Sequence, residues 1–341
     1  MTGQAIGPVI GGLLNSAWGF RSISWFLFAM SVIVLTALLI FLPETQRSIA
    51  GNGSIPLTGL QKPLSYTINP PRAWTQSPKA TRPSNPHSPM SLKKICSPLA
   101  YILEKDIAAL LAWGAIAYTA WSMVTSSTTT MLLLGFPSLT QWQIGLCFLP
   151  NGIGCISGSL STGWLLNQSF RRVETKYKVQ QSIPNDTIIS TTAHNDFPYI
   201  KARLRLMPLF SAILAVSLAL YGPSFEFNDL NHSPGNLAAP LVLQFLIAFT
   251  STAILNVNST VLIDCFPERP ASAAALNNLC QCLLGAAGVS VIQPLIDAVK
   301  AMRAFLIVTG VVVLFTPLIW VEWRWGERWR RNREERLKGK K

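Results

Sequence analysis

The chain has 341 residues, of which half are hydrophobic and only 13% are charged, about half the charged share of an ordinary globular domain. This composition excludes a typical water-soluble domain and indicates an integral membrane protein. The formal net charge of +13 would suggest a nucleic-acid ligand in a soluble protein, but here the basic residues flank apolar segments. We therefore expect the lipid bilayer, and no nucleic acid, as their partner.

The first predicted element is a short apolar segment rich in glycine. Gly3, Gly7 and Gly11 are spaced four apart and share one helix face, with Pro8 between them and Gly12 beside them. Such a face lets a second helix backbone approach closely, and a membrane helix tolerates the proline. About fifteen suitable residues give a helix of about 22 Å, shorter than a hydrocarbon core of about 30 Å. We predict an incomplete span; a signal peptide is disfavoured because no basic segment precedes it.

Seven full spans of about 20 apolar residues follow along the chain. They lie near residues 24–42, 106–134, 143–166, 205–222, 239–264, 271–296 and 303–323. The predicted fold class is therefore an all-α integral membrane protein with about eight transmembrane helices, the first of them incomplete.

Polar segments between the spans define the expected domains. Residues 43–105 are rich in proline and poor in large apolar groups, which predicts a disordered linker, and residues 167–204 form a second expected loop. We expect a two-helix N-terminal remnant at 1–42, the linker at 43–105, a six-helix bundle at 106–325 and a basic tail at 326–341.

The basic residues predict the orientation. All but three of the 28 Lys and Arg residues lie in or beside the segments 43–105, 167–204, 265–270 and 324–341, which fall on one side of the predicted spans. The positive-inside rule places this side, with the linker and the C-terminus, in the cytosol. The chain is thus predicted to be a multi-pass protein of the plasma membrane or of a vacuolar or vesicular membrane.

Several stretches resemble the major facilitator superfamily. The run from Gly3 to Leu14 is similar to the fifth-helix motif of its proton-coupled antiporters, and LPETQR at 42–47 is similar to the signature that closes the sixth helix. Residues 143–172 and 262–288 resemble the eighth and the tenth-to-eleventh helices of its fungal drug:proton antiporters, the branch with quinidine- and polyamine-type exporters.

The resemblance implies a partial fold of this superfamily that lacks the first four and a half helices. In the complete fold two bundles rock against each other and the fifth helix packs on the eighth, so the Gly7 face would meet the glycines Gly154 and Gly158. An ordinary tight helix contact without a gating role is the alternative for this glycine pair. We also expect that the chain alone does not transport.

Polar groups at mid-membrane are the candidate lining of a substrate cavity, because such groups are costly unless they face a cavity or a partner helix. The candidates are Tyr118, Trp121, Ser122, Asn256, Ser259 and Gln281. Bonds within the helix are the alternative for the hydroxyl groups, and a bond between helices is the alternative for Asn256. The pattern of this branch resembles Asn-Leu-x-Arg-Cys, and Gln281 occupies the position of its arginine. A cation that could pair with an anionic substrate is thus replaced by a neutral amide.

A carboxylate and a cation at the cytosolic end of the 239–264 span form a possible gate. These residues are Asp264 and Arg269. Capping of the next helix is the alternative for Asp264.

Catalytic chemistry is not expected. The three histidines all fall in predicted loops, so no histidine-based catalytic or metal site is expected inside the membrane, and no P-loop or cofactor motif is present. The resemblance implies a proton-coupled exporter of small organic molecules, of the drug or secondary-metabolite type, that works by alternating access. The alternatives are a non-transporting membrane fragment or degenerate copy, and an organic-acid exporter of the same branch, which Gln281 disfavours. The sequence does not predict the oligomeric state.

Overall fold

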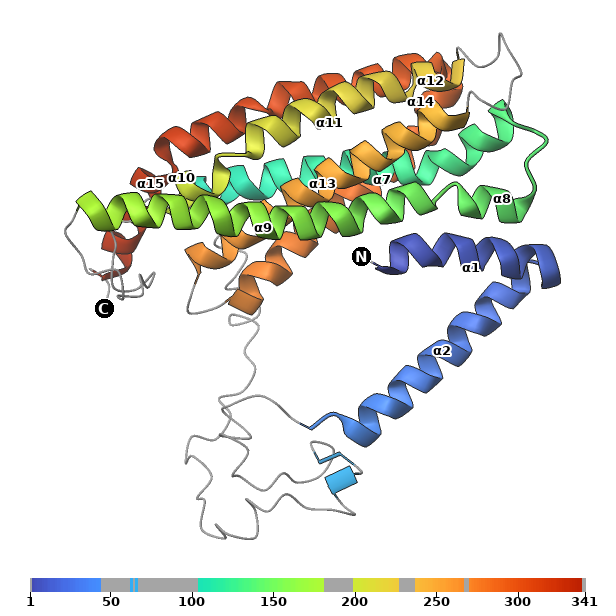
Figure 1. Ribbon diagram of the computed structural model, residues 1–341, viewed down its shortest axis with the longest axis horizontal. Coiled ribbons are helices and arrows are strands. Elements are labelled where there is room, and N and C mark those ends of the chain that lie inside the picture. Colours follow the sequence, from blue (N-terminus) through green and yellow to red (C-terminus); the bar gives the residue numbers. More distant parts are fainter. Residues whose placement is uncertain are drawn as a thin grey trace. The chain divides into compact units, whose positions relative to one another are not determined.

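The computed structural model describes residues 2–43, 62–63, 65–66, 104–180, 199–226, 237–266 and 270–338. All its regular elements within these ranges are helices (Figure 1). The chain divides into two compact units, one of Met1–Leu13 with Cys96–Lys341 and one of Leu14–Ile95, which are treated separately below. Most of the predicted linker, the three histidines, Cys96 and Arg269 lie outside the described residues.

The smaller unit contains the end of α1 (Thr2–Trp18) and the whole of α2 (Phe20–Phe41). Gly19 separates the two helices with φ at 76°, a backbone conformation that favours glycine. The Ser22 hydroxyl donates hydrogen bonds to the carbonyl oxygens of Leu14 and Gly19, at 3.0 and 2.7 Å, and so fixes the turn. None of the residues of α2 is buried. An apolar helix with this much exposed surface is typical of a segment that faces lipid.

The larger unit is a helix bundle. Its helices are α7 (Lys105–Gly135), α8 (Gln141–Leu146), α9 (Leu149–Gln180), α10 (Tyr199–Leu204), α11 (Met207–Tyr221), α12 (Pro223–Glu226), α13 (Ala238–Cys265), α14 (Pro270–Phe315) and α15 (Pro317–Lys338). Helix α13 packs along α9, α11 and α7, and α14 packs along α7 and α11 (Figure 1). Trp113, Tyr221 and Phe305 are among the largest fully buried side chains of the described bundle, and the rings of Tyr221 and Phe305 meet edge to face at 5.0 Å.

Polar residues inside the long helices are accommodated by local hydrogen bonds. In α7 the hydroxyl groups of Thr119 and Thr125 donate to the carbonyl oxygens of Ala115 and Trp121, four residues earlier, at 2.7 and 2.9 Å. Thr309 does the same in α14 with Phe305. Each of the three hydroxyl groups thus has a hydrogen-bond acceptor within its own helix and needs none from the lipid. A segment that contains threonine can therefore remain helical in a membrane.

Six helical segments within the described residues are long and apolar enough to cross a membrane. They are Phe20–Phe41, Lys105–Gly135, Gln141–Gln180, Met207–Glu226, Ala238–Cys265 and Pro270–Arg333. The last segment breaks at Lys300, where φ is 69°, so its two arms correspond to the separate spans predicted at 271–296 and 303–323. The predicted all-helical, multi-pass membrane fold is confirmed.

Two boundaries differ from the sequence prediction. The span predicted at 143–166 is divided between α8 and α9, and α9 continues as a regular helix to Gln180, where a loop from residue 167 was expected. Polar residues begin at Asn167, but they include good helix formers and a Glu174–Lys178 ion pair of 2.8 Å across one turn. Likewise, the expected tail at 326–341 is helical through Lys338, as part of α15.

Candidate functional site

Tyr118 on α7 faces the glycine-containing side of α14. A Cβ atom added to Gly285 would lie 2.8 Å from Cε1 of Tyr118 and 3.8 Å from the Ser122 hydroxyl, so the glycine provides the room for both side chains. Both Tyr118 and Ser122 are half-buried. Gln281 lies one turn before Gly285 and is 8% exposed. The structure thus brings three predicted cavity residues to the same pair of helices.

Trp121 lies beside Tyr118 but has a partner of its own. The two rings meet edge to face with centroids 6.0 Å apart. The Trp121 indole N–H donates to Oδ1 of Asn151 on α9 at 3.0 Å, in a buried position. A buried hydrogen bond therefore links Trp121, beside Tyr118, to α9. The sequence analysis did not single out Asn151.

The other two predicted cavity residues, Asn256 and Ser259, lie on α13. The Asn256 amide donates to the Ser159 hydroxyl of α9 at 3.2 Å and is half-buried, so the bond between helices that was the alternative for this residue is present. Ser259 is half-buried. Asn256 therefore faces α9, whereas Tyr118 and Ser122 lie at the α7–α14 contact, one turn from Gln281 along α14.

A buried pair of amide side chains lies next to α7. Asn258, which is fully buried, donates to Oδ1 of Asn277 on α14 at 3.3 Å. Any side chain at Gly114 of α7 would collide with the Asn258 amide. The three residues thus join α7, α13 and α14 in one tight contact.

The small-residue face of α9 packs against a different helix from the one expected. Cβ atoms added to Gly154 and Gly158 would lie 2.6 and 2.5 Å from the carbonyl oxygens of Phe245 and Phe249 on α13. The expected contact of these glycines with Gly7 is therefore wrong for the described structure. Spacing four apart predicts a close approach but does not specify the partner helix.

The glycines of α1 make fewer contacts than expected. No atom lies within 4 Å of a Cβ atom added to Gly3, Gly7 or Gly11. At Gly12 the added atom would be 3.0 Å from the Gln141 carbonyl oxygen and 3.3 Å from Cα of Gly145 on α8. One added to Gly145 would be 2.8 Å from the Pro8 carbonyl oxygen. Within the larger unit, the close contact of α1 is therefore with α8.

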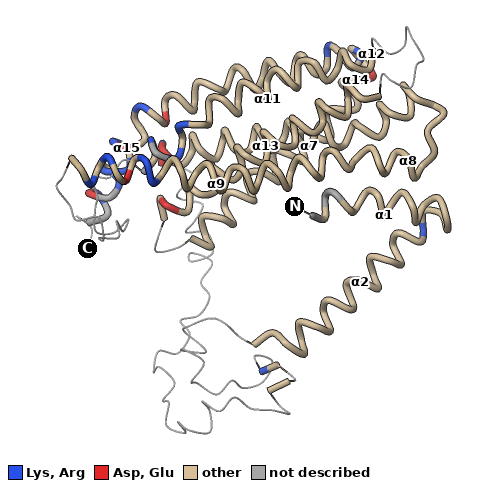
Figure 2. Tube along the Cα trace, viewed as in Figure 1, with Lys and Arg blue, Asp and Glu red and all other residues tan. Residues whose placement is uncertain are grey.

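Most charged residues of the described bundle lie at one end, around α15 and the C-terminal end of α9 (Figure 2). Nη1 of Arg333 on α15 lies 2.7 Å from Oδ2 of Asp106 on α7, and both side chains are buried. The Arg333 guanidinium also lies over the Phe266 ring, 5.0 Å from its centroid, and donates to the Cys265 carbonyl oxygen at 3.4 Å. These contacts tie α15 to both α7 and the end of α13.

The predicted gate carboxylate pairs with a residue other than the expected one. Asp264 lies 3.2 Å from Nε of Arg203 on α10, and this guanidinium stacks on the Phe170 ring of α9 at 4.8 Å. Arg269, the expected partner, lies outside the described residues. Arg203 precedes Asp264 by 61 positions, so no local motif indicated this pair.

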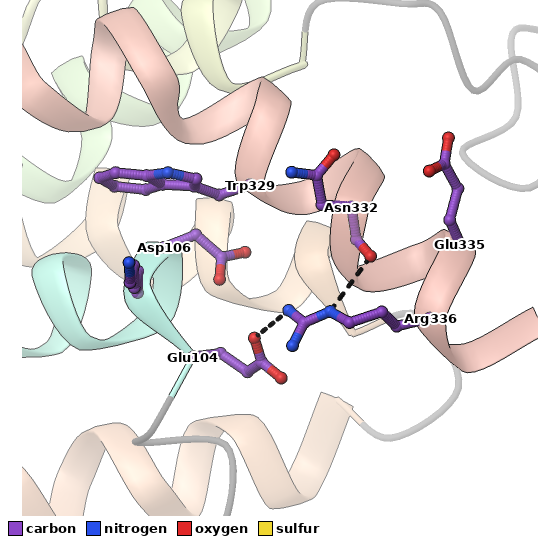
Figure 3. Close-up of a pocket in the computed structure, with 7 residues that line it drawn as sticks. Glu104, Asp106, Trp329, Asn332, Glu335 and Arg336 are labelled. Carbon is purple, nitrogen blue, oxygen red and sulfur yellow. Dashed lines mark hydrogen bonds and ion pairs between the residues drawn. The ribbon is translucent and has the colours of Figure 1, made fainter. Parts of the chain in front are cut away.

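A cavity of about 720 Å³ opens beside the Asp106–Arg333 contact (Figure 3). Its lining comes from the start of α7 and from the last turns of α15: Glu104, Lys105, Asp106, Trp329, Asn332, Glu335 and Arg336. Arg336 donates to the Glu104 carboxylate at 2.8 Å and to the Asn332 carbonyl oxygen at 3.3 Å, as the dashed lines in Figure 3 show. Both charge signs are present, so the cavity has no strong preference for an anion or a cation.

The model of one family, described as Major Facilitator Superfamily, matches residues 1–178. The chain belongs to the Major Facilitator Superfamily. The members of this superfamily are membrane transporters, so the match groups the chain with transporters and not with enzymes. The resemblance inferred from the glycine motif and from LPETQR is confirmed by this match and by the relatives described next.

Fungal transporters of this superfamily are similar to the chain along most of its length. Citrate exporter 1 of Aspergillus niger is 43% identical over 340 residues, which are 100% of this chain and 63% of the relative. Multidrug transporter QDR2 of Candida glabrata is 30% identical over 83% of this chain and 50% of its own length. Quinidine resistance protein 1 of Saccharomyces cerevisiae is 28% identical over 91% of this chain and 56% of its own. The chain thus spans between half and 63% of these relatives, and no solved structure matches it significantly.

Proposed function

We propose that the protein is a secondary transporter that exports small organic molecules by alternating access, driven by a proton gradient. The observation that carries this proposal is the 43% identity, along the whole chain, with a relative named as an exporter. Because the chain spans 63% of that relative, the activity of a complete transporter is part of the proposal.

The α7–α14 contact supports a site for an organic molecule. Tyr118 has an aromatic face and a hydroxyl group, and Ser122 has a second hydroxyl group. Both contact the helix at Gly285, and Gln281 lies one turn before this glycine. Ligand sites combine apolar and aromatic surface with a few neutral polar groups in this way. The residues can accept and donate hydrogen bonds without a fixed charge.

Two substrate classes compete, and we place organic acids first. The identity with the citrate exporter is 43%, against 28–30% with the quinidine and multidrug transporters, and it extends over more of the chain. Drug-like or secondary-metabolite substrates are the second candidate, favoured by the neutral residues at the α7–α14 contact. Arg203 and Arg333 are held by Asp264 and Asp106, so neither is a ready partner for an anion in this conformation.

A transport assay separates these candidates. Because the chain alone is expected not to transport, the inside-out vesicles would contain it joined to an N-terminal segment that completes the first bundle. They would be given labelled citrate or quinidine, with and without a protonophore. We expect accumulation of citrate that the protonophore abolishes. Accumulation of quinidine alone would support the second class. Transport of neither, with the protein present and folded in the vesicles, would contradict the proposal and support a non-transporting membrane protein.

We also propose that the charged end of the bundle faces the cytosol, in the plasma membrane or in a vacuolar or vesicular membrane. Most of the Lys and Arg residues of the described bundle lie around α15, α10 and the end of α9, as Figure 2 shows, and basic residues are enriched on the cytosolic side of membrane helices. Three exposed tryptophans lie in the first half of α15: Trp320, Trp323 and Trp325. Tryptophan is enriched at the boundary between lipid and water, so this part of α15 is expected to lie there.

A further inference from the structure

Glu322 is a buried carboxyl group that the charge pairs described above do not use. It lies on α15, is 1% exposed, and neither of its oxygen atoms has a hydrogen-bond partner among the described residues. A Cβ atom added to Gly326, one turn later, would lie 2.5 Å from Oε1 of Glu322. Gly326 therefore makes the room in which this carboxyl group lies against its own helix.

A second buried residue with a polar atom unpaired among the described residues lines a small cavity together with Glu322. Trp113 on α7 is 1% exposed, and its indole N–H also has no hydrogen-bond partner within the described part of the chain. Trp113 and Glu322 both line a cavity of about 10 Å³, and the rest of the lining is apolar, including Leu110, Leu204 and Met207. A volume of about 10–15 Å³, measured in this way, is what one water molecule needs.

The cations around this cavity are already engaged by other carboxylates. Arg333 lies against Asp106 at 2.7 Å, as described above. On α10, Lys201 lies 3.5 Å from Glu327 and Arg203 lies 3.2 Å from Asp264. Arg330, on α15, interacts electrostatically with Asp264. An ionised carboxylate at Glu322 would therefore be buried beside apolar side chains without a donor. Asp106 nearby would add repulsion, and Arg333, which would attract the carboxylate, is already paired with Asp106.

We propose that Glu322 is a buried proton-binding site that carries its proton in this conformation, and that one water molecule joins its carboxyl group to the Trp113 indole. The indole N–H donates to the water oxygen, and the water donates to a carboxyl oxygen of Glu322. A neutral acid needs no counterion, and the water satisfies the two polar groups that the described protein leaves without partners. The inference goes beyond the proposed export function, because it concerns the protonation of one residue and requires no transport.

Infrared difference spectroscopy at neutral pH tests the proposal on the purified protein in lipid nanodiscs. The difference between wild type and Glu322→Gln should contain the C=O band of one protonated carboxyl group. The matched control is Glu335→Gln, at an exposed position of the same helix, whose difference spectrum should contain only the bands of an ionised carboxylate. Carboxylate bands in the Glu322→Gln difference would overturn the proposal.

A second variant tests the water bridge and remains informative if Glu322→Gln does not fold. Trp113→Phe keeps an aromatic ring but removes the N–H donor. We expect the protonated-carboxyl band to persist at a shifted frequency, because the water that bonds to it has lost its other partner. A folded Trp113→Phe protein with an unshifted band would contradict the bridge, and one with no such band in either protein would contradict the proton site.

Discussion

The Arg333 guanidinium and the Asp106 carboxylate approach within 2.7 Å although they are 4% and 1% exposed, and they join the last helix of the described bundle to its first. An ion pair at the water-exposed surface contributes little to stability, but one partner left alone in a buried position is strongly unfavourable. The packing of α15 on α7 therefore requires both charged residues of the pair.

Removal of one member of this pair should destabilise the bundle. Arg333→Met should lower the free energy of unfolding by about 3–5 kcal/mol, because Asp106 would remain buried without its cation. Thermal unfolding of the purified protein in detergent is the measurement. Arg336→Met is the control, since Arg336 makes an exposed pair with Glu104 and its loss should cost about 0–1 kcal/mol. Equal melting temperatures for the two variants would show that the buried pair does not hold α15.

The α9–α13 contact should not accept a side chain at Gly158. The methyl group of Gly158→Ala would lie 2.5 Å from the Phe249 carbonyl oxygen, so the two backbones must separate, at a cost of about 1–3 kcal/mol. Gly163→Ala is the matched control on the same helix, because no atom lies within 4 Å of its added Cβ. A lower melting temperature is expected for the first variant only, and similar melting of both would show that the helices part at no cost.

The proposed substrate site should respond to a change at Gly285 that does not touch the substrate directly. Gly285→Ala would displace the Tyr118 ring, from which the new methyl group would be only 2.8 Å away, and should change the apparent affinity for the exported molecule several-fold. Tyr118→Ala should change it in the same assay. Gly310→Ala, at a position with no atom within 4 Å, should leave transport unchanged. Normal affinity in both Gly285→Ala and Tyr118→Ala, with normal expression, would show that the substrate does not bind at the α7–α14 contact.

The proposed orientation predicts the side on which the C-terminus lies. A glycosylation reporter fused after Lys341 should remain unmodified in cells, because α15 with its basic residues would face the cytosol. A protease-sensitive tag at the same position should be accessible in inside-out vesicles and protected in sealed cells. A glycosylated reporter would reverse the orientation.

The number and type of helices could be predicted because hydrophobic length is a local property. The apolar runs at 106–134 and 239–264 correspond closely to α7 and α13. The ends were less predictable, since polar residues after Asn167 continue α9 in water as readily as they would form a loop. Length and composition decide whether a segment enters the membrane, but the helix itself can extend beyond it.

The partners of the polar residues could not be predicted, because each depends on a residue distant in the chain. Asp264 pairs with Arg203 and Asn256 with Ser159, 97 positions away. The sequence indicated that such polar groups need hydrogen-bond or ion-pair partners, but it did not indicate which of the many possible residues these partners are. Glu322 was missed because it occurs within a run of charged and tryptophan residues that resembles a solvated surface. Only Gly326, one turn later, indicated that this face of α15 is packed.

Helix α9 has 32 residues and is thus about 48 Å long, well beyond a hydrocarbon core of about 30 Å. Its last turns carry Lys178 paired with Glu174, and Phe170 near their base lies under Arg203, which anchors them to the bundle. A small protein domain joined through an uninterrupted helix to Gln180 would therefore inherit the orientation of the bundle. Such a fusion would give electron cryomicroscopy a rigid marker outside the micelle.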